Sequence, residues 1–116
     1  MKRGDVVLVD FPYADGGRGK IRPAVVVQHD RDNGRLSNTI VAMISGNIRH
    51  STEPTQVLVD PRAPVGSSSG LHGASVVKGN NLFTVRQRDV LRTLGHLSDP
   101  LLQELEQCLK SALDLP

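Results

Sequence analysis

The amino-acid sequence predicts a mainly β domain of the α+β kind, in which a small, curled antiparallel sheet or barrel is closed by one C-terminal helix. One observation is a succession of short segments rich in valine and isoleucine, each bounded by glycine, proline, asparagine or aspartate. Another is a single amphipathic helical pattern at the end of the chain. A parallel, doubly wound sheet would require helices between the strands, and no helical pattern lies there. The 116 residues suit a single domain, with the sheet over about 1–97 and the helix over about 99–113.

Four strands are expected in the first half of the chain. Residues 5–11 and 22–28 are rich in β-branched side chains, and the second of these segments follows a glycine-rich loop. Between them and the next strand, residues 29–35 contain an Asn-Gly pair, which is a strong turn signal. Residues 39–44 are almost entirely apolar, which predicts a strand buried on both faces. Residues 55–60 alternate between apolar and polar side chains and predict a strand with one buried face.

The second half of the chain begins with a connection rich in glycine, serine and proline, residues 61–72, which we expect to be mobile. Two short strands are predicted at 74–78 and 82–85, on either side of Gly79-Asn80-Asn81. Residues 90–97 fit neither period well, and we expect a helical turn followed by a short strand.

The final helix has the clearest pattern. Ser98 or Asp99 can cap it, and Pro100 stands in its first turn, where proline is tolerated. The apolar positions recur at helical spacing, namely Leu101, Leu105, Cys108 and Ala112, joined by Leu102, Leu109 and Leu113.

Composition excludes several classes of protein. No apolar run approaches the roughly 20 residues of a membrane-spanning helix, and the N-terminus lacks the apolar region of a signal peptide. The single cysteine, Cys108, cannot form an intrachain disulfide, so the sequence predicts a cytoplasmic protein. The four histidines are scattered, and neither zinc-ligand spacing nor a phosphate-binding Walker loop occurs, so no metal site and no cofactor are expected.

Charge is divided unevenly along the chain. Residues 1–98 hold 13 Lys and Arg against 8 Asp and Glu, whereas residues 99–116 hold one against four. A polyanion would therefore bind the body of the protein rather than its terminal helix. The chain has only three aromatic residues, Phe11, Tyr13 and Phe83, which argues against an extended platform for stacking bases.

The candidate functional groups stand in loops and at strand ends. A glycine-rich segment, residues 16–20, runs into Arg22-Pro23, where a loop meets a strand. Together, these loop and strand-end residues are rich in hydrogen-bond donors and poor in carboxylates, which suits binding of a phosphodiester. RNA carries its own nucleophile, the 2′-hydroxyl, so cleavage of RNA needs little further machinery. The residues of this set are Arg18, Lys20, Arg22, Ser45, Asn47, Arg49, Asn80 and Asn81.

Several motifs, in the same order along the chain, resemble the MazF/PemK family of type II toxin–antitoxin toxins. They are Arg3 to Asp10, Gly19 to Val27, Ile40 to Ser45, Pro54 to Val59, Leu71 to Val77 and Leu82 to Val85. The resemblance implies an SH3-like β-barrel with a terminal helix, assembled as a homodimer. It also implies an mRNA interferase, a sequence-specific endoribonuclease that cleaves single-stranded RNA without a metal and is inhibited by a cognate antitoxin.

The resemblance assigns roles to individual residues. Arg22 matches the catalytic arginine of the family, and Ser45 matches its catalytic threonine or serine. In that family the 2′-hydroxyl attacks the adjacent phosphate and leaves a cyclic phosphate and a 5′-hydroxyl. The expected RNA-binding residues are Arg18, Lys20 and Arg49, which position the backbone, Tyr13, which stacks on a base, Asn81, at the place of a family glutamine, and Asn47.

The chain departs from the family pattern in its loop, and two other hypotheses for its function stay open. Some members carry a loop glutamate that falls near Gly17 here, so the general base is unassigned, with Glu53 and Asp15 as unranked substitutes. A gyrase-poison type of toxin shares the fold and acts by binding alone, and an inactive relative would retain only antitoxin binding. The presence of both Arg22 and Ser45 favours the ribonuclease. The class of RNA, messenger, ribosomal or transfer, stays open.

Overall fold

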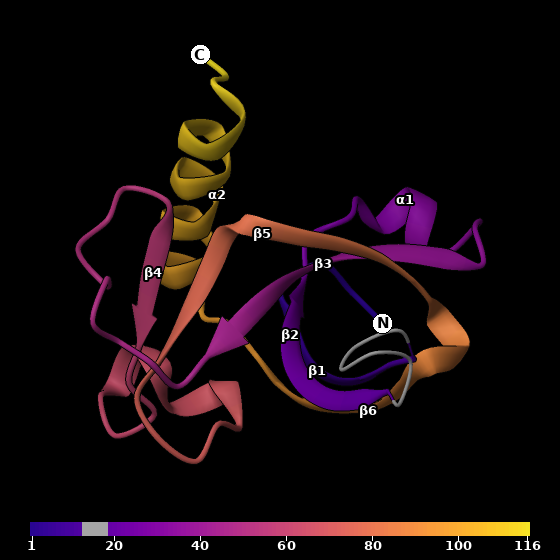
Figure 1. Cartoon of the computed structure of the whole chain (residues 1–116), viewed down its shortest axis with the longest axis horizontal. Helices are drawn as coiled ribbons and strands as arrows, with labels where there is room; N and C mark the ends of the chain where they lie inside the picture. Colours follow the sequence, from indigo (N-terminus) through magenta and orange to yellow (C-terminus); the bar gives the residue numbers. More distant parts are fainter. Residues whose placement is uncertain (13–18) are drawn as a thin grey trace.

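The computed structural model describes residues 1–12 and 19–116. Within them, six strands form one antiparallel sheet in the order β4-β5-β3-β2-β1-β6 (Figure 1). The strands are β1 (Asp5–Phe11), β2 (Lys20–Val26), β3 (Asn38–Ser45), β4 (Gln56–Val59), β5 (Ser75–Arg86) and β6 (Val90–His96). The helices are α1 (Asp30–Asn33), α2 (Asp99–Leu113) and the 3₁₀ turns η2 (Pro64–Ser69) and η3 (Gln87–Asp89).

The sheet curls strongly without closing. Figure 1 shows β1, β2, β6 and the second half of β5 bent into a ring, with α2 standing beside β4 and the first half of β5. The strands at the two ends of the order, β4 and β6, are not paired with each other in the described residues. The predicted mainly β fold with a C-terminal helix is therefore confirmed, with the barrel left open between β4 and β6.

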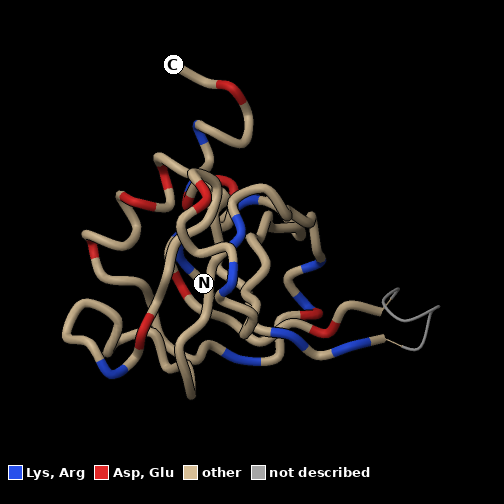
Figure 2. The backbone as a smooth tube through the Cα atoms, turned by 60° about the vertical axis from the view of Figure 1, so that its left-hand side comes forward, with Lys and Arg blue, Asp and Glu red and all other residues tan. Residues whose placement is uncertain are grey.

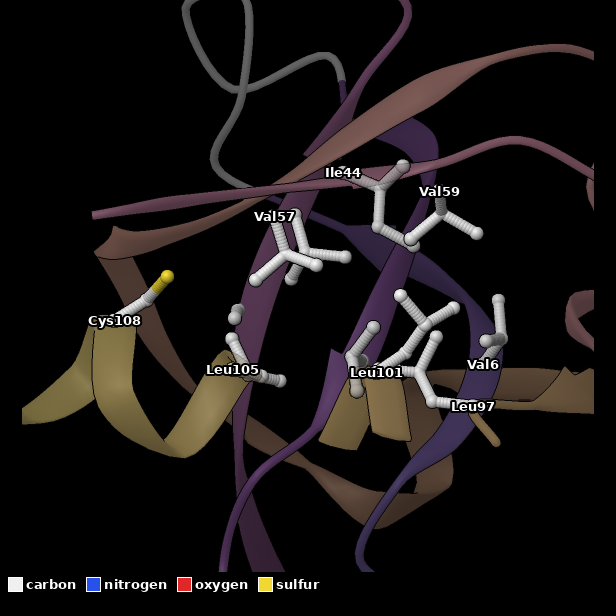
Figure 3. Close-up of a cluster of buried hydrophobic side chains, with 11 residues drawn as sticks. Val6, Ile44, Val57, Val59, Leu97, Leu101, Leu105 and Cys108 are labelled. Atoms are coloured by element: carbon white, nitrogen blue, oxygen red, sulfur yellow. The ribbon is translucent and has the colours of Figure 1, made fainter. Parts of the chain in front are cut away.

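Two apolar cores lie on opposite faces of the sheet. The helix-side core consists of Val6, Val25, Ala42, Ile44, Val57, Val59, Val77, Leu97, Leu101, Leu105 and Cys108 (Figure 3). The ring core, inside the curled strands, consists of Val7, Val9, Phe11, Ala24, Val26 and Val41. Because successive side chains of a strand point to opposite faces, β3 contributes to both: Ala42 and Ile44 to the first, Val41 to the second. The prediction that this strand is buried on both faces is confirmed.

Helix α2 matches its predicted bounds and places Leu101, Leu105 and Cys108 on the buried side. Burial raises the pKa of the Cys108 thiol, in keeping with its place among apolar side chains. Ser98 is the N-cap residue, but its hydroxyl does not cap the helix. It donates instead to the carbonyl of Val65 at 2.7 Å and ties the start of α2 to η2. None of the described helices is long and apolar enough to cross a bilayer.

The connection between β4 and β5, which the sequence predicts to be mobile, is instead organised by η2 and packed against β6. The contact needs glycine. A Cβ on Gly95 would lie 2.2 Å from the carbonyl oxygen of Ser68, and one on Gly70 would lie 2.1 Å from that of Leu94. Gly70 also has a positive φ of 73°, which suits glycine at the end of a helical turn. Ser68 Oγ donates to the carbonyl of His96 at 2.8 Å.

Four other elements differ from the sequence prediction. Strand β6 spans Val90–His96, and the helical turn expected within 90–97 lies just before it, at η3. The two short strands expected around residues 79–81 are one strand, β5, and β2 lies two residues earlier than expected. The turn expected at 29–35 contains the short helix α1, which is fixed by hydrogen bonds from its buried Asn33. Asn33 Nδ2 donates to the Gln28 carbonyl at 2.9 Å, and its Oδ1 accepts from Thr39 Oγ1 at 2.7 Å.

Candidate functional site

A pocket of about 550 Å³ opens at the mouth of the ring. Five strands and the turn η3 surround the ring interior, and the pocket continues the ring core outward from Phe11 and Met43. Its floor is apolar, whereas cationic side chains stand among its lining residues. These residues are Phe11, Pro12, Lys20, Arg22, Met43, Phe83, Thr84, Val85, Arg86 and Asp89.

Arg22, the predicted catalytic arginine, lies in β2, lines the pocket and is exposed to solvent. It pairs with Val9 of β1. Because side chains alternate along a strand, Arg22 shares a face with Ala24 and Val26, which belong to the ring core. The strand therefore anchors Arg22 through two buried neighbours and leaves its guanidinium at the ring mouth.

Ser45, the predicted catalytic hydroxyl, is the last residue of β3 and lies on the same face as Met43. The β2–β3 ladder ends at the pair Ala24↔Met43, next to Pro23, which has no N–H to donate. In the described part of the chain β2 and β3 do not pair beyond Ala24↔Met43, and Arg22 lines the pocket whereas Ser45 does not. Alternation along the two strands nevertheless gives both residues the ring side of the sheet.

The loop after β3 is held by two successive side-chain-to-backbone hydrogen bonds. Ser45 Oγ accepts from the Asn47 N–H at 3.1 Å, and Asn47 Oδ1 accepts from the Arg49 N–H at 3.1 Å. These bonds use acceptor atoms, so the hydroxyl proton of Ser45 and the amide protons of Asn47 can still donate to an anion. Asn47 and Arg49 are both exposed. The predicted RNA-binding residues of this loop therefore lie next to Ser45.

Asn81 lies in a bulge of β5 that the sequence did not predict. The register passes from Ala42↔Leu82 to Met43↔Lys78, so residues 79–81 are extra on the β5 side. Gly79 is buried, its N–H donates to Thr55 at 2.8 Å, and a Cβ there would lie 3.2 Å from that of Cys108. With Gly79 turned inward, Asn80 and Asn81 stay exposed next to the part of β3 that carries Met43.

The remaining predicted residues divide into three groups. Lys20 opens β2 opposite Phe11, lines the pocket and is half-buried. Glu53, one of the two candidate bases, is exposed in the β3–β4 loop and does not line the pocket. Tyr13, Arg18 and Asp15 lie outside the described residues.

Three features of the pocket were not recognised from the sequence. Phe11 and Phe83 come together with their ring centroids 5.6 Å apart in an edge-to-face arrangement. Phe83 is 45% exposed, which is high for a phenylalanine, whereas Phe11 is buried. Arg86 and Asp89 form an ion pair at the pocket rim, with Nε 2.9 Å from Oδ2. An aromatic residue directly before Pro12 and another after the Asn80-Asn81 pair were the available signals.

Ionisable groups with shifted pKa values lie away from this pocket. The backbone N–H of Arg3 holds the pKa of Asp30 below its usual range, and Arg35 does the same for Asp32 through a side-chain hydrogen bond. Within residues 1–12 and 19–116, no three His, Cys, Asp or Glu side chains gather as a metal site. Figure 2 shows acidic positions along α2, while the sheet and its loops carry most of the basic ones. The charge division seen in the sequence is therefore also a division in space.

Comparison with known protein families agrees with this geometry. Residues 2–113 match the family described as PemK-like, MazF-like toxins of type II toxin–antitoxin systems. The chain belongs to this family. Among individual MazF-like proteins, the chain is 32% identical to endoribonuclease MazF of Staphylococcus saprophyticus, over 99% of this chain and 92% of that protein. It is 28% identical to endoribonuclease EndoA of Bacillus subtilis, over 99% and 96% of the two chains.

Solved structures of MazF-like proteins share the fold. An endoribonuclease from a mycobacterial species, solved in complex with its cognate antitoxin, superposes with a TM-score of 0.80 at 22% identity. That match covers 100% of this chain and 97% of the other. Mycobacterium tuberculosis toxin MazF-mt6 superposes with a TM-score of 0.78 at 25% identity, over 97% and 98% of the two chains. The open sheet with a C-terminal helix is therefore the family architecture.

Proposed function

We propose that this protein is a toxin of a type II toxin–antitoxin system and acts as an endoribonuclease on single-stranded RNA. Its relatives MazF and EndoA bear the name endoribonuclease, and the chain is similar to them over nearly its whole length. The proposal includes sequence-specific cleavage that needs no metal and leaves a cyclic phosphate and a 5′-hydroxyl.

The observation that carries this proposal is the exposed Arg22 at the pocket mouth, on the side of the sheet that the alternation of β3 also gives to Ser45. A guanidinium is positively charged at neutral pH and donates two parallel hydrogen bonds to a phosphate. A hydroxyl beside it adds a third donor for the same oxygens. Donors fixed by a rigid sheet stabilise the extra negative charge of the transition state at little cost in reorganisation.

In the proposed reaction the 2′-oxygen of one nucleotide attacks the adjacent phosphorus. The P–O2′ bond forms, the P–O5′ bond breaks, and no redox partner is needed. Arg22 stabilises the phosphorane-like transition state and protonates the departing 5′-oxygen, and the proton that leaves the 2′-hydroxyl, carried by water, restores the guanidinium. Ser45 helps to hold the phosphate, while Lys20, Asn47, Arg49 and Asn81 position the chain of the RNA. The same role is proposed for Arg18, and base stacking for Tyr13.

The proposal extends to assembly and control. It includes a homodimer, a cytoplasmic location and inhibition by a cognate antitoxin, and it is supported by membership in a toxin–antitoxin family and by the antitoxin bound to the mycobacterial relative. The basic body of the protein suits an acidic antitoxin segment that folds on binding.

Cleavage of a long single-stranded RNA in EDTA tests this function. We expect the wild type to produce discrete cuts whose products carry 5′-hydroxyl ends. Arg22→Ala should reduce the rate by at least about 10²-fold, the usual loss when one transition-state donor is removed. Ser45→Ala should cost about tenfold, as expected for one neutral hydrogen bond.

Arg62→Ala is the matched control, because Arg62 is exposed, pairs with Asp60 and does not line the pocket. It should cut at the wild-type rate, and all variants should melt at the wild-type temperature. Intact RNA with well-folded wild-type protein would contradict the ribonuclease. Inhibition of gyrase would then indicate the binding toxin, and antitoxin binding alone would indicate an inactive relative.

A further inference from the structure

The ring-mouth pocket combines an aromatic wall with an apolar floor. Phe83 presents 45% of its surface to solvent, although it packs edge-to-face on the buried Phe11. Met43 and Val85, which continue the ring core, complete the apolar part of the lining. An exposed aromatic face over an apolar floor is suited to a flat, uncharged ring system, because stacking buries both faces away from water. At about 550 Å³ the pocket is within the range of small-ligand sites.

An arginine whose guanidinium is held by a carboxylate lies at the rim of the same pocket. Arg86 Nε donates to Asp89 Oδ2 at 2.9 Å, and Arg86 Nη2 donates to Asp89 Oδ1 at 3.4 Å. This pair uses the Nε/Nη2 edge of the guanidinium. The adjacent Nη1/Nη2 edge carries two parallel N–H donors, and the Arg86 side chain is 47% exposed. The Asp89 side chain, at 18% exposure, thus fixes the orientation of an arginine that still has a two-donor edge to offer.

The distance between this arginine and the proposed phosphate site suits a single nucleotide. Val90, next to Asp89, pairs with Val9 of β1, which in turn pairs with Arg22 of β2. Since β6 and β2 both pair with β1, two strand spacings of about 4.8 Å put the backbones of residues 90 and 22 roughly 10 Å apart along the wall of the ring. A phosphate held at Arg22 can therefore be connected through its sugar to a base in the pocket.

We propose that the ring-mouth pocket is a nucleobase subsite specific for guanine, in which Phe83 stacks on the base and Arg86, oriented by Asp89, donates to guanine O6 and N7. The inference rests on the proposed ribonuclease function and adds its specificity. Two parallel N–H donors match the two acceptors on that edge of guanine, whereas adenine presents one acceptor and one donor there.

The carboxylate of Asp89 argues against an acidic protein segment as the occupant. It already neutralises the guanidinium of Arg86, so a carboxylate side chain would gain little attraction at this end of the pocket, whereas a neutral base needs none. The apolar floor argues equally against a bare phosphate, which would bind the cations Lys20 and Arg22 and leave Phe83 and that floor uncovered. A neutral, planar ring with two acceptors satisfies both conditions.

Mapping of 5′-hydroxyl ends across a long RNA pool tests the inference through cleavage. The wild-type cut sites should share a guanine at one fixed position relative to the cleaved bond. Arg86→Gln should still cut, more slowly, and should lose this preference by roughly 10- to 100-fold, the discrimination that a bidentate arginine–guanine contact provides. Asp89→Asn should weaken the preference in part. Arg88→Gln is the matched control, since Arg88 is exposed on η3 and does not line this pocket, and it should keep the wild-type preference.

A second measurement does not depend on cleavage. In a titration followed by nuclear magnetic resonance, 5′-GMP should shift the Phe83 ring and Arg86 Nε–H signals at concentrations about tenfold below those needed for 5′-AMP. Arg86→Gln should abolish that difference.

The outcomes separate the two proposals. Wild-type cutting without a guanine preference, or an unchanged preference in Arg86→Gln, overturns the subsite and leaves the ribonuclease standing. Binding of 5′-GMP without any cleavage of RNA overturns the ribonuclease and leaves the subsite. Shifts of Phe83 with an acidic peptide but not with either nucleotide would make the pocket a protein-binding site and overturn the inference.

Discussion

The two faces of this sheet are built from the same strands yet differ in how they are closed. The helix-side core is covered by α2, and its central residue Leu105 is fully buried. Among the described residues no helix covers the mouth of the ring core: outward from the buried Val9 and Val41 lies the half-exposed Phe83, which lines the same pocket as Arg22. The comparison indicates that the fold obtains its stability mainly on one face and leaves the other face available for a ligand.

The largest effect on stability should come from the middle of α2. Leu105→Ala removes a fully buried side chain from the helix-side core and should lower the free energy of unfolding by about 2–5 kcal/mol, measured by urea denaturation. Leu113→Ala is the matched control in the same helix, because Leu113 is 54% exposed and its loss should change stability by no more than about 0.5 kcal/mol. Equal losses for the two variants would contradict the assignment of this face as the stabilising one.

A smaller loss is expected where η2 packs on β6. Gly95→Ala would bring a Cβ within 2.2 Å of the Ser68 carbonyl oxygen, so the backbones must separate, at a cost of about 1–3 kcal/mol. The midpoint of thermal unfolding would report it. Gly73→Ala, where nothing lies within 4 Å of the new atom, should leave the midpoint unchanged. A Gly95 variant as stable as the wild type would mean that η2 moves aside without cost.

The smallest effect on stability is expected at the ring mouth. Phe83→Ala removes a large side chain, but one that is 45% exposed, and should cost about 1 kcal/mol rather than the 3–5 of a buried phenylalanine. The same variant should bind 5′-GMP more weakly, since the stacking face is gone. A loss of 3 kcal/mol or more would show that Phe83 belongs to the core rather than to a ligand site.

Local patterns in the sequence were sufficient for most of the fold. Helix α2 was predicted at its observed bounds, because its apolar spacing and Pro100 are local signals. Strand β1 was likewise predicted at its observed bounds. The union of two predicted short strands into β5 was missed, since the bulge at Gly79 depends on contacts with Thr55 and Cys108, which are distant in the sequence. The regular structure of η2 was missed for the same reason. Its packing on β6 requires glycine at positions 95 and 70, and each of these glycines lies against a residue distant in the sequence.

The candidate site was accessible from the sequence only in part. Arg22 and Ser45 could be named because each stands at a strand end next to a recognisable motif, and the register then brought them to one face. The aromatic wall and the Arg86–Asp89 pair could not be named, because Phe11 and Phe83 meet only after the sheet has curled. The positions of Phe11 before Pro12 and of Phe83 after the Asn80-Asn81 pair were the available signals, and neither indicates a shared pocket.

The alternation along β3 has a consequence for how such a protein can diverge. Val41 faces the ring and Ala42 faces the helix, so neighbouring residues of β3 pack in different cores. Substitution of exposed residues at the ring mouth, such as Phe83, can therefore change the ligand-facing surface without touching the packing under α2. The strand separates two packing layers, so the ligand-facing edge of the protein can change while the fold is kept.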